Sequence, residues 1–141
     1  MTLSLALVFT SIGFCQLTKP ENGGEPDKIV EIFGENGTIK FVEKDKEKPE
    51  AVTLVVGQSI RWTNKDSKTH RVICTLEGDD KPIFDTGPIK SGASKDLLLN
   101  IDIYRRAGGK TANFVMLKYH TDEPRQNPGE IVLLSAARRG N

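Results

Sequence analysis

Few side chains in this chain of 141 residues are suited to covalent or metal chemistry, namely two histidines and two cysteines. Cys15 and Cys74 are too few for a disulfide framework or for a zinc site built from cysteine. No Ser–His–Asp, cysteine–histidine or paired-carboxylate arrangement stands out around His70 or His120. The sequence therefore does not indicate an enzyme, and the motifs around the two histidines must carry its function.

Composition and charge narrow the classes of function. Hydrophobic residues make up 37% of the chain and charged residues 28%, which is enough for one core but not for two large ones. The 20 Lys and Arg residues are almost balanced by 19 Asp and Glu residues, so the formal net charge is only +1. Such a balance gives no strong field for attracting nucleic acid. We therefore predict a single domain that does not bind nucleic acid.

One basic segment, residues 105–110, has the sequence RRAGGK and allows two interpretations. Its Gly-Gly-Lys lacks the spacing of a P-loop and does not lie between a strand and a helix, so phosphate binding is not indicated. Together with Arg138 and Arg139, the segment could dock an acidic partner surface in the weak, salt-sensitive manner of electron-transfer proteins. A solvated loop is the simpler interpretation.

The N-terminal part of the chain has the layout of an export signal. Residues 3–14 are mostly apolar, and a run of this length is too short to cross a bilayer of about 30 Å as a helix. Residues 1–16 are therefore predicted to be a signal peptide or a lipoprotein leader, although the usual Lys or Arg before the apolar run is missing. Cys15 is a possible site of lipid attachment; the alternative is that it is removed with the signal. The expected location is the periplasm or the cell envelope.

The pattern after this leader is that of a β protein. Residues 17–27 are predicted to be a polar linker and residues 28–141 the folded domain, in which short runs rich in Val, Ile and Thr alternate with Gly, Pro, Asn and Asp. The predicted strands are residues 29–33, 38–42, 52–56, 59–63, 71–76, 96–103, 113–119 and 130–134. Strands of this length and spacing favour an all-β sandwich or small barrel. The charged run 43–50 is predicted to be a solvated loop.

The segment that leads to His70 has a pattern of its own. Apolar residues alternate along residues 52–56 and 59–63, and a Gly-Gln turn separates the two runs. We therefore predict a hairpin with one buried face. Polar residues 64–67 then connect this hairpin to His70, which is expected to begin a strand at the end of the sandwich, next to loops.

Three separated motifs resemble the cupredoxin family of copper proteins. They are residues 56–72 (VGQSIRWTNKDSKTHRV), residues 84–94 (FDTGPIKSGAS) and residues 118–134, which begin with KYH and contain PGE before a last apolar strand. The first is similar to the family's aromatic-bearing strand that leads through Asn-x-Asp to the first copper-ligating histidine, here His70. The third resembles the last ligand loop and last strand of plastocyanin-like proteins. The resemblance implies a single Greek-key β-sandwich or barrel of about eight strands.

The copper ligands that this resemblance implies are only partly present. A blue-copper site needs two imidazoles, one thiolate and a weak axial thioether. Where the family has Tyr-His-Cys-x-x-His, this sequence has YHTDEP at residues 119–124. With Tyr119 aligned on the family's tyrosine, Thr121 takes the place of the thiolate and Pro124 that of the second imidazole. No methionine follows, so the blue-copper site as the family builds it cannot form.

Two interpretations of His70 and His120 remain open. In the first, the site is lost, because strand periodicity puts Tyr119 and Thr121 on one face and His120 on the other. In the second, a bulge shifts the strand by one residue, so that His120 takes the thiolate position and Glu123 lies where the second imidazole normally sits. His70, His120 and Glu123 then offer two imidazoles and one carboxylate, which suit Cu(II) or another divalent metal. In favour of the second, both histidines fall at the loops where the family holds copper.

Cys74 and Met116 are poorer candidates for ligands. Cys74 lies four residues after His70, which is about 13 Å along a strand, so it is predicted to be a buried apolar thiol. Met116 precedes the ligand loop and is predicted to belong to the core.

The function predicted from the sequence is that of an exported cupredoxin-like protein that is not an enzyme. We expect it to bind copper at a non-blue, histidine-based site and to act in electron transfer or copper handling, with a possible redox partner protein. The alternative is a metal-free module of the same fold that binds a protein partner through its loops.

Overall fold

Nine strands and one short helix make up residues 24–136, the part of the chain that the computed structural model describes. They are β1 (Lys28–Glu35), β2 (Thr38–Glu43), β3 (Val52–Val55), β4 (Ser59–Asn64), β5 (His70–Cys74), β6 (Phe84–Ile89), β7 (Ser94–Leu98), α1 (Ile101–Arg106), β8 (Phe114–Tyr119) and β9 (Gly129–Leu134). The predicted leader with Cys15, linker residues 17–23, Arg138 and Arg139 lie outside the described residues. No helix within residues 24–136 has the length and apolar character needed to cross a bilayer.

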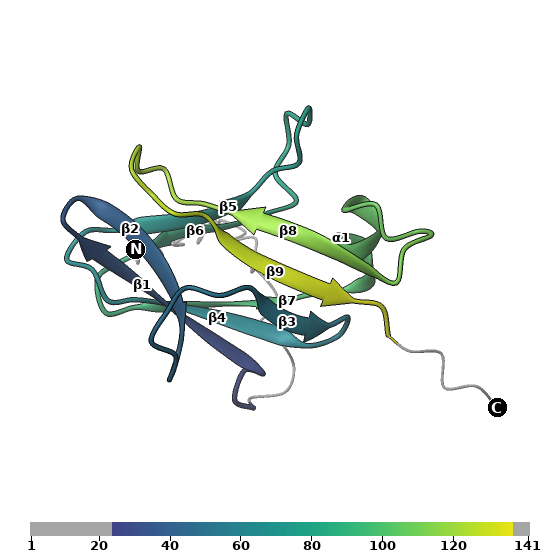
Figure 1. The fold of residues 1–141 in the computed structure, drawn as a ribbon, viewed down its shortest axis with the longest axis horizontal. Helices are drawn as coiled ribbons and strands as arrows, with labels where there is room; N and C mark the ends of the chain where they lie inside the picture. The colour runs from purple at the N-terminus through teal and green to yellow at the C-terminus, as the bar shows by residue number, and fades with distance from the viewer. Residues whose placement is uncertain (1–23, 137–141) are drawn as a thin grey trace, which may run out of the picture.

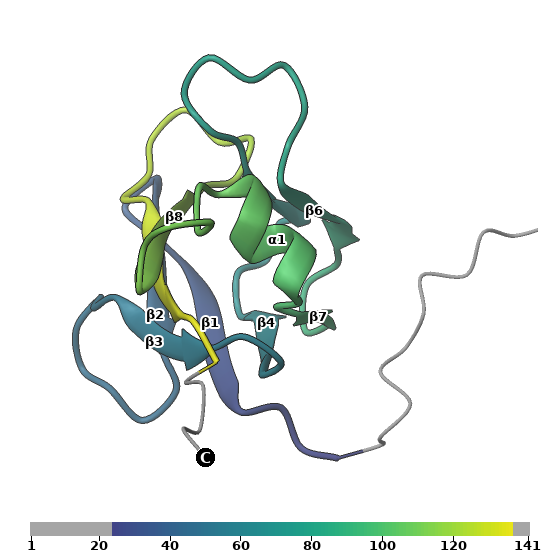
Figure 2. The ribbon, with the colours of Figure 1, turned by 90° about the vertical axis from the view of Figure 1, so that its right-hand side faces the viewer.

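The strands form a sandwich, as predicted, and not a closed barrel. One sheet has the order β2-β1-β4-β7, a second has the order β3-β9-β8, and β5 pairs with β6 (Figure 1). The pairs β1–β4 and β3–β9 are parallel, whereas the other pairs are antiparallel. In Figure 2, α1 lies across the end of the sandwich that faces the viewer. Single bridges from Ile39 to Gln126 and from Ile73 to His120 link the sheets at their edges.

Aromatic side chains from both layers meet in the core. The Trp62 ring lies 5.6 Å from the Tyr119 ring and 5.5 Å from the Phe84 ring, and the Phe41 ring lies 4.8 Å from Tyr119. Offset and edge-to-face contacts of this kind add about 0.5–1.5 kcal/mol per pair beyond the burial of area. The core therefore fixes the ends of β4 and β8, which lead to the two histidines.

The hairpin predicted for residues 52–63 is wrong. β3 pairs with β9 and β4 pairs with β1 and β7, so the two runs belong to different sheets. Gly57 makes the crossing with a φ of 99°, which favours glycine. The predicted alternation of buried and exposed residues is confirmed in both strands. Leu54 and Ile60 face the same core from opposite layers, and this arrangement produces the same sequence pattern as a hairpin.

The strand predicted for residues 96–103 is also wrong in its second half. β7 ends at Leu98, and α1 begins three residues later because Asn100 caps it. The Asn100 amide oxygen accepts hydrogen bonds from the backbone N–H groups of Asp102 at 3.1 Å and Ile103 at 3.0 Å. Strand β6, Phe84–Ile89, was not among the predicted strands, because its internal Gly-Pro resembles a turn.

Two predictions on sulfur-containing side chains have opposite outcomes. Cys74 is buried, as predicted, with 1% of the residue exposed. Met116 does not belong to the core and is 48% exposed. The reason is the alternation of β8, in which Val115 and Leu117 face inward and Met116 faces outward.

Candidate metal centre

His70 is the side chain around which the candidate site is built. It is the first residue of β5, and it faces the core together with Val72 and Cys74, so that 1% of the residue is exposed. Its Nε2 atom lies 2.6 Å from a carboxylate oxygen of Asp66. Its Nδ1 atom is also buried and has no hydrogen-bond partner among the described residues. One ring nitrogen is thus held by a carboxylate while the other is unpartnered.

The loop before β5 is built to present Asp66 to His70. Asn64 is fully buried at the end of β4, and its amide nitrogen donates to two backbone carbonyls, at 2.7 and 2.8 Å. Its amide oxygen accepts a hydrogen bond from the backbone N–H of Asp66 at 2.9 Å. The backbone N–H of Ser67 donates to the Asp66 carboxylate at 2.8 Å. The Asn-x-Asp motif therefore fixes the backbone and the carboxylate that orient the imidazole.

Gly34 of β1 leaves the space that this carboxylate occupies. A Cβ atom at position 34 would lie 2.5 Å from an oxygen of Asp66. The hydrogen bond with His70 is the main cause that lowers the pKa of Asp66, and the N–H of Ser67 adds to it, while burial acts in the opposite direction. Asp66 is thus an ionised acceptor at neutral pH.

The backbone brings His120 alongside β5, but its side chain does not follow His70 into the core. The N–H and C=O groups of His120 and Ile73 exchange hydrogen bonds of 2.8 and 2.9 Å. The pairing of β8 with β9 runs without interruption through Tyr119, and Thr121 is buried while His120 is only partly buried. β8 thus contains no bulge, so the one-residue shift that would put His120 in the thiolate position does not occur, and the alternation continues through Thr121. The Nδ1 atom of His120 lies 2.8 Å from the Thr121 carbonyl oxygen.

Gln126 closes the loop after His120. Its amide oxygen accepts a hydrogen bond of 2.6 Å from the backbone N–H of Thr121, and its amide nitrogen donates to the carbonyls of Thr121 at 3.0 Å and Glu123 at 2.6 Å. The Thr121 hydroxyl accepts a hydrogen bond from the Glu123 N–H at 3.1 Å. Thr121, which stands at the place of the thiolate in the resemblance, is therefore a structural residue of this loop. Nothing in the sequence pattern had pointed to Gln126.

Glu123 lies near the loop that precedes His70. Its carboxylate is 3.8 Å from the Lys68 ammonium, and both side chains are partly exposed, by 31% and 69%. The hydrogen bond with Asp85 is the main cause that raises the pKa of Arg71, and the charge of Asp122 adds to it. Residues 122–123 thus lie beside residues 68–71. Within residues 24–136, however, no group of three or more His, Cys, Asp and Glu side chains is already arranged to hold a metal ion.

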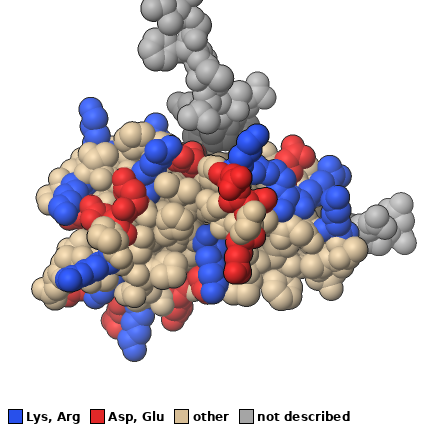
Figure 3. All heavy atoms as spheres, turned by 90° about the horizontal axis from the view of Figure 1, so that it is seen from above, with Lys and Arg blue, Asp and Glu red and all other residues tan. Residues whose placement is uncertain are grey.

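Cys74 and the basic segment take no part in this site. Burial raises the pKa of the Cys74 thiol to about 11, so the thiol is protonated and unreactive at neutral pH. Lys and Arg side chains gather at the right-hand end of the face in Figure 3, the end where Figure 1 places α1. There the Arg106 guanidinium donates to the carbonyls of Pro82 at 3.0 Å and Ile83 at 3.2 Å, so this arginine stabilises the fold.

Comparison with solved structures identifies the architecture. A structure described as a novel purple cupredoxin from Nitrosopumilus maritimus is similar with a TM-score of 0.50 and 19% identity, over 76% of this chain and 99% of that one. The Cu(I) form of the M51A mutant of amicyanin is similar with a TM-score of 0.50 and 16% identity, over 78% of this chain and 84% of that one. No family model and no curated protein sequence matches the chain. The sandwich that holds His70 and His120 at adjacent loops is a cupredoxin-like fold.

Proposed function

We propose that this protein binds copper through Nδ1 of His70 and acts in copper handling. The observation that carries the proposal is the buried Nδ1 atom, which has no partner among the described residues although Asp66 holds the same ring through Nε2. An unpartnered buried polar atom costs about 1–3 kcal/mol, and a bound metal ion would remove that cost.

The contact with Asp66 also determines which nitrogen is available. An ionised carboxylate can only accept hydrogen bonds, so the neutral imidazole must carry its proton on Nε2 and keep its lone pair on Nδ1. Imidazoles that bind metals in proteins usually donate their other N–H to a carboxylate or a carbonyl. The Asp66–His70 pair supports the role of His70 as the first ligand.

His120 and Glu123 are the proposed further ligands. His120 can bind a metal through Nε2 and keep the contact of 2.8 Å between its Nδ1 and the Thr121 carbonyl, but Glu123 must give up its contact of 3.8 Å with Lys68. An exposed ion pair such as the second contributes less than about 1 kcal/mol, so its loss costs little. Copper bound by imidazole and carboxylate would supply a Lewis-acidic, redox-active centre without the thiolate bond that gives blue sites their colour.

The need to rearrange ligands favours copper handling over electron transfer. Precise electron-transfer sites hold all their ligands in place beforehand, whereas here the His120 side chain does not follow His70 into the core and Glu123 is paired with Lys68. We propose an exported protein of the periplasm or cell envelope that takes up copper and passes it to a partner protein. Amicyanin, whose similar structure is described as a Cu(I) form, supports copper as the metal to test first.

A second candidate function is a metal-free module that binds a partner through its loops. The observation that favours it is the loop of Thr121 and Gln126, whose backbone and side chains satisfy one another without a metal. Within residues 24–136, no three His, Cys, Asp or Glu side chains are already arranged to hold a metal ion.

Copper titration of the purified full chain distinguishes the two functions. Calorimetry and electron paramagnetic resonance should show one Cu(II) site. The visible spectrum should show only weak ligand-field absorption and no intense band at about 600 nm. His70→Ala should abolish this binding, and His120→Ala and Glu123→Gln should weaken it. Glu130→Gln is the control, because Glu130 is a carboxylate that pairs with Lys118 on the outer face of the sheet.

Each outcome decides between the functions. Unchanged copper affinity in His70→Ala would refute the site, and absence of Cu(II) or Cu(I) binding to the wild-type chain would favour the metal-free module. An intense blue colour would require a thiolate ligand and would contradict the proposed ligand set.

A further inference from the structure

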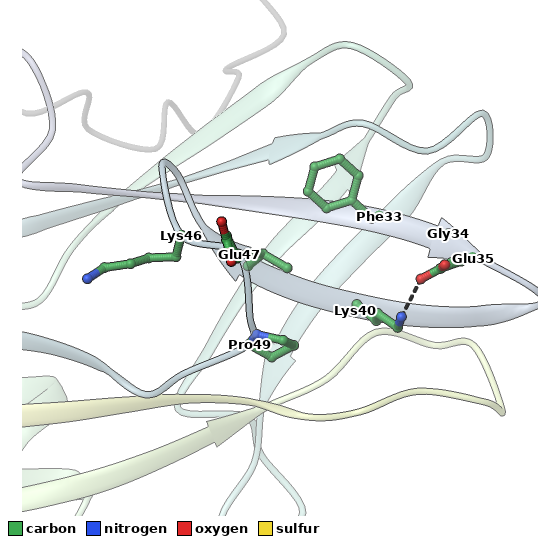
Figure 4. A pocket seen from close by; sticks show the side chains of 8 residues that line it. Phe33, Gly34, Glu35, Lys40, Lys46, Glu47 and Pro49 are labelled. Carbon is green, nitrogen blue, oxygen red and sulfur yellow. Dashed lines mark hydrogen bonds and ion pairs between the residues drawn. The ribbon is translucent and has the colours of Figure 1, made fainter.

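A pocket of about 470 Å³ lies on the outer face of β1 and β2. It is lined by Phe33, Gly34, Glu35, Lys40, Val42, Lys46, Glu47 and Pro49 (Figure 4). Its volume falls within the range of about 300–1,000 Å³ that is usual for small-molecule sites.

The pocket has an apolar floor with one aromatic ring. Phe33 faces outward from β1 and is 37% exposed, although an aromatic side chain is usually buried more completely. Val42 lies on the neighbouring strand, opposite Glu31, and Pro49 closes the pocket from the loop after β2. These three side chains can contact the apolar body of a ligand.

The charged side chains of the pocket leave a carboxylate without a partner. Lys40 is paired with Glu35, which cancels one positive and one negative charge. Figure 4 shows the Lys46 ammonium extending away from the pocket, while the Glu47 carboxylate stands on the same side of the ribbon as the Phe33 ring. Glu47 makes no side-chain hydrogen bond or ion pair with any residue that the structure describes.

We propose that this pocket binds a small organic cation, an amine or quaternary ammonium group on an apolar body. The face of the Phe33 ring attracts a cation through its quadrupole, and the Glu47 carboxylate supplies the opposite charge. The floor formed by Val42 and Pro49 covers the apolar part. An organic anion would find no free ammonium inside the pocket, because Lys40 is paired and Lys46 points away.

The test uses benzyltrimethylammonium as the probe and the full chain labelled with nitrogen-15. Amide chemical-shift changes should map to residues 33–35 and 40–49, with a dissociation constant of about 1–10 mM for such an open pocket. Benzoate and the neutral, water-soluble benzyl alcohol, at the same concentrations, distinguish charge from simple apolar contact. Only the cation should shift these amides strongly.

Two variants and two controls assign the recognition to the residues named. Glu47→Gln should weaken binding about fivefold, and Phe33→Leu about two- to fivefold. Glu50→Gln is the matched control, because Glu50 is an exposed carboxylate in the same loop that does not line the pocket. Lys46→Gln should leave binding unchanged or strengthen it.

The proposal fails if benzyltrimethylammonium leaves the amides of the pocket unshifted at about 10 mM, or if the neutral benzyl alcohol binds as tightly as the cation. It also fails if Glu50→Gln weakens binding as much as Glu47→Gln, which would indicate a general charge effect. The result is independent of copper, because none of the lining residues is a proposed copper ligand.

Discussion

The hydrogen bond between Asp66 and His70 should be the strongest side-chain pair in the loops at this end of the sandwich. The His70 side chain is fully buried, the Asp66 side chain is 15% exposed, and the two atoms lie 2.6 Å apart. A hydrogen bond to a charged group contributes about 1.5–3 kcal/mol, and the second hydrogen bond of Asp66, from Ser67, adds about 0.5–1.5 kcal/mol. Asp66→Ala should therefore lower the free energy of unfolding by about 2–4 kcal/mol.

A double-mutant cycle isolates the pair from these other effects. His70→Phe keeps a ring of similar shape and removes both nitrogens, so Asp66→Ala should cost about 1.5–3 kcal/mol less in that background. The matched control is Arg71 and Asp85, a pair that starts at the next residue of β5 but whose side chains are 48% and 22% exposed. Its coupling should be below about 1 kcal/mol.

Urea denaturation of the metal-free protein, followed by tryptophan fluorescence, measures both cycles, since Trp62 is the only tryptophan and lies in the core. If the Asp66–His70 coupling is no larger than the Arg71–Asp85 coupling, His70 is not held as described. The basis of the proposed copper site would then be lost.

The same pair gives stability a defined dependence on pH. Because hydrogen bonding with His70 lowers the pKa of Asp66 below its ordinary value of 3.8, the folded state favours the ionised carboxylate more than the unfolded state does. This contribution is fully present above the ordinary value and is lost as the pH falls through the lowered pKa. Asp66→Asn should therefore lose less stability than the wild type as the pH falls below about 4. An identical acid dependence in the two proteins would contradict this assignment.

Three further predictions concern Gly34, the cap of α1 and the N-terminal segment. Gly34→Ala should destabilise the wild type by about 1–2 kcal/mol in urea denaturation but much less the Asp66→Ala variant, because the three atoms nearest to the new Cβ all belong to that carboxylate; an equal cost in both would locate the strain elsewhere. Asn100→Ala should cost about 1 kcal/mol through loss of the α1 cap, whereas Asn100→Ser should cost much less. Deleting residues 1–26 should leave the melting temperature unchanged by differential scanning calorimetry, because Asp27, which bonds to Ser59, is retained; a large decrease would show that the deleted residues stabilise the sandwich.

The sequence was sufficient for the fold class because alternation along strands is a local signal. The inward positions of β4, Ile60 and Trp62, follow from polar and apolar periodicity alone. Periodicity does not determine to which sheet each strand belongs, because a Gly-Gln turn between two alternating runs suits both a hairpin and a crossing between layers. α1 was missed because its short helix depends on a cap at Asn100 within a run of β-favouring residues.

Only the part of the candidate site that precedes and includes His70 could be predicted from the sequence. The motif from Asn64 to His70 is local, and the four-residue spacing of Asp66 and His70 already allows the observed contact. The second half depends on Gln126, whose amide reaches back five residues to Thr121, and no pattern in the sequence distinguishes such a residue from a solvated loop residue. Strand parity favoured one of two orientations of His120, and the continuous pairing of β8 with β9 through Tyr119 shows that β8 has no bulge.

The loop of Thr121 and Gln126 and the His70 side chain differ in whether their polar groups have hydrogen-bond partners. The loop of Thr121 and Gln126 satisfies its own polar groups, as a structure without a metal should. His70 does not, because its Nδ1 atom is buried and unpartnered at a cost of about 1–3 kcal/mol that a phenylalanine would avoid. A buried polar group without a protein partner calls for an explanation, and a bound ion is one of them. This difference supports the proposal that His70 is the first copper ligand and that the other ligands rearrange when the metal binds.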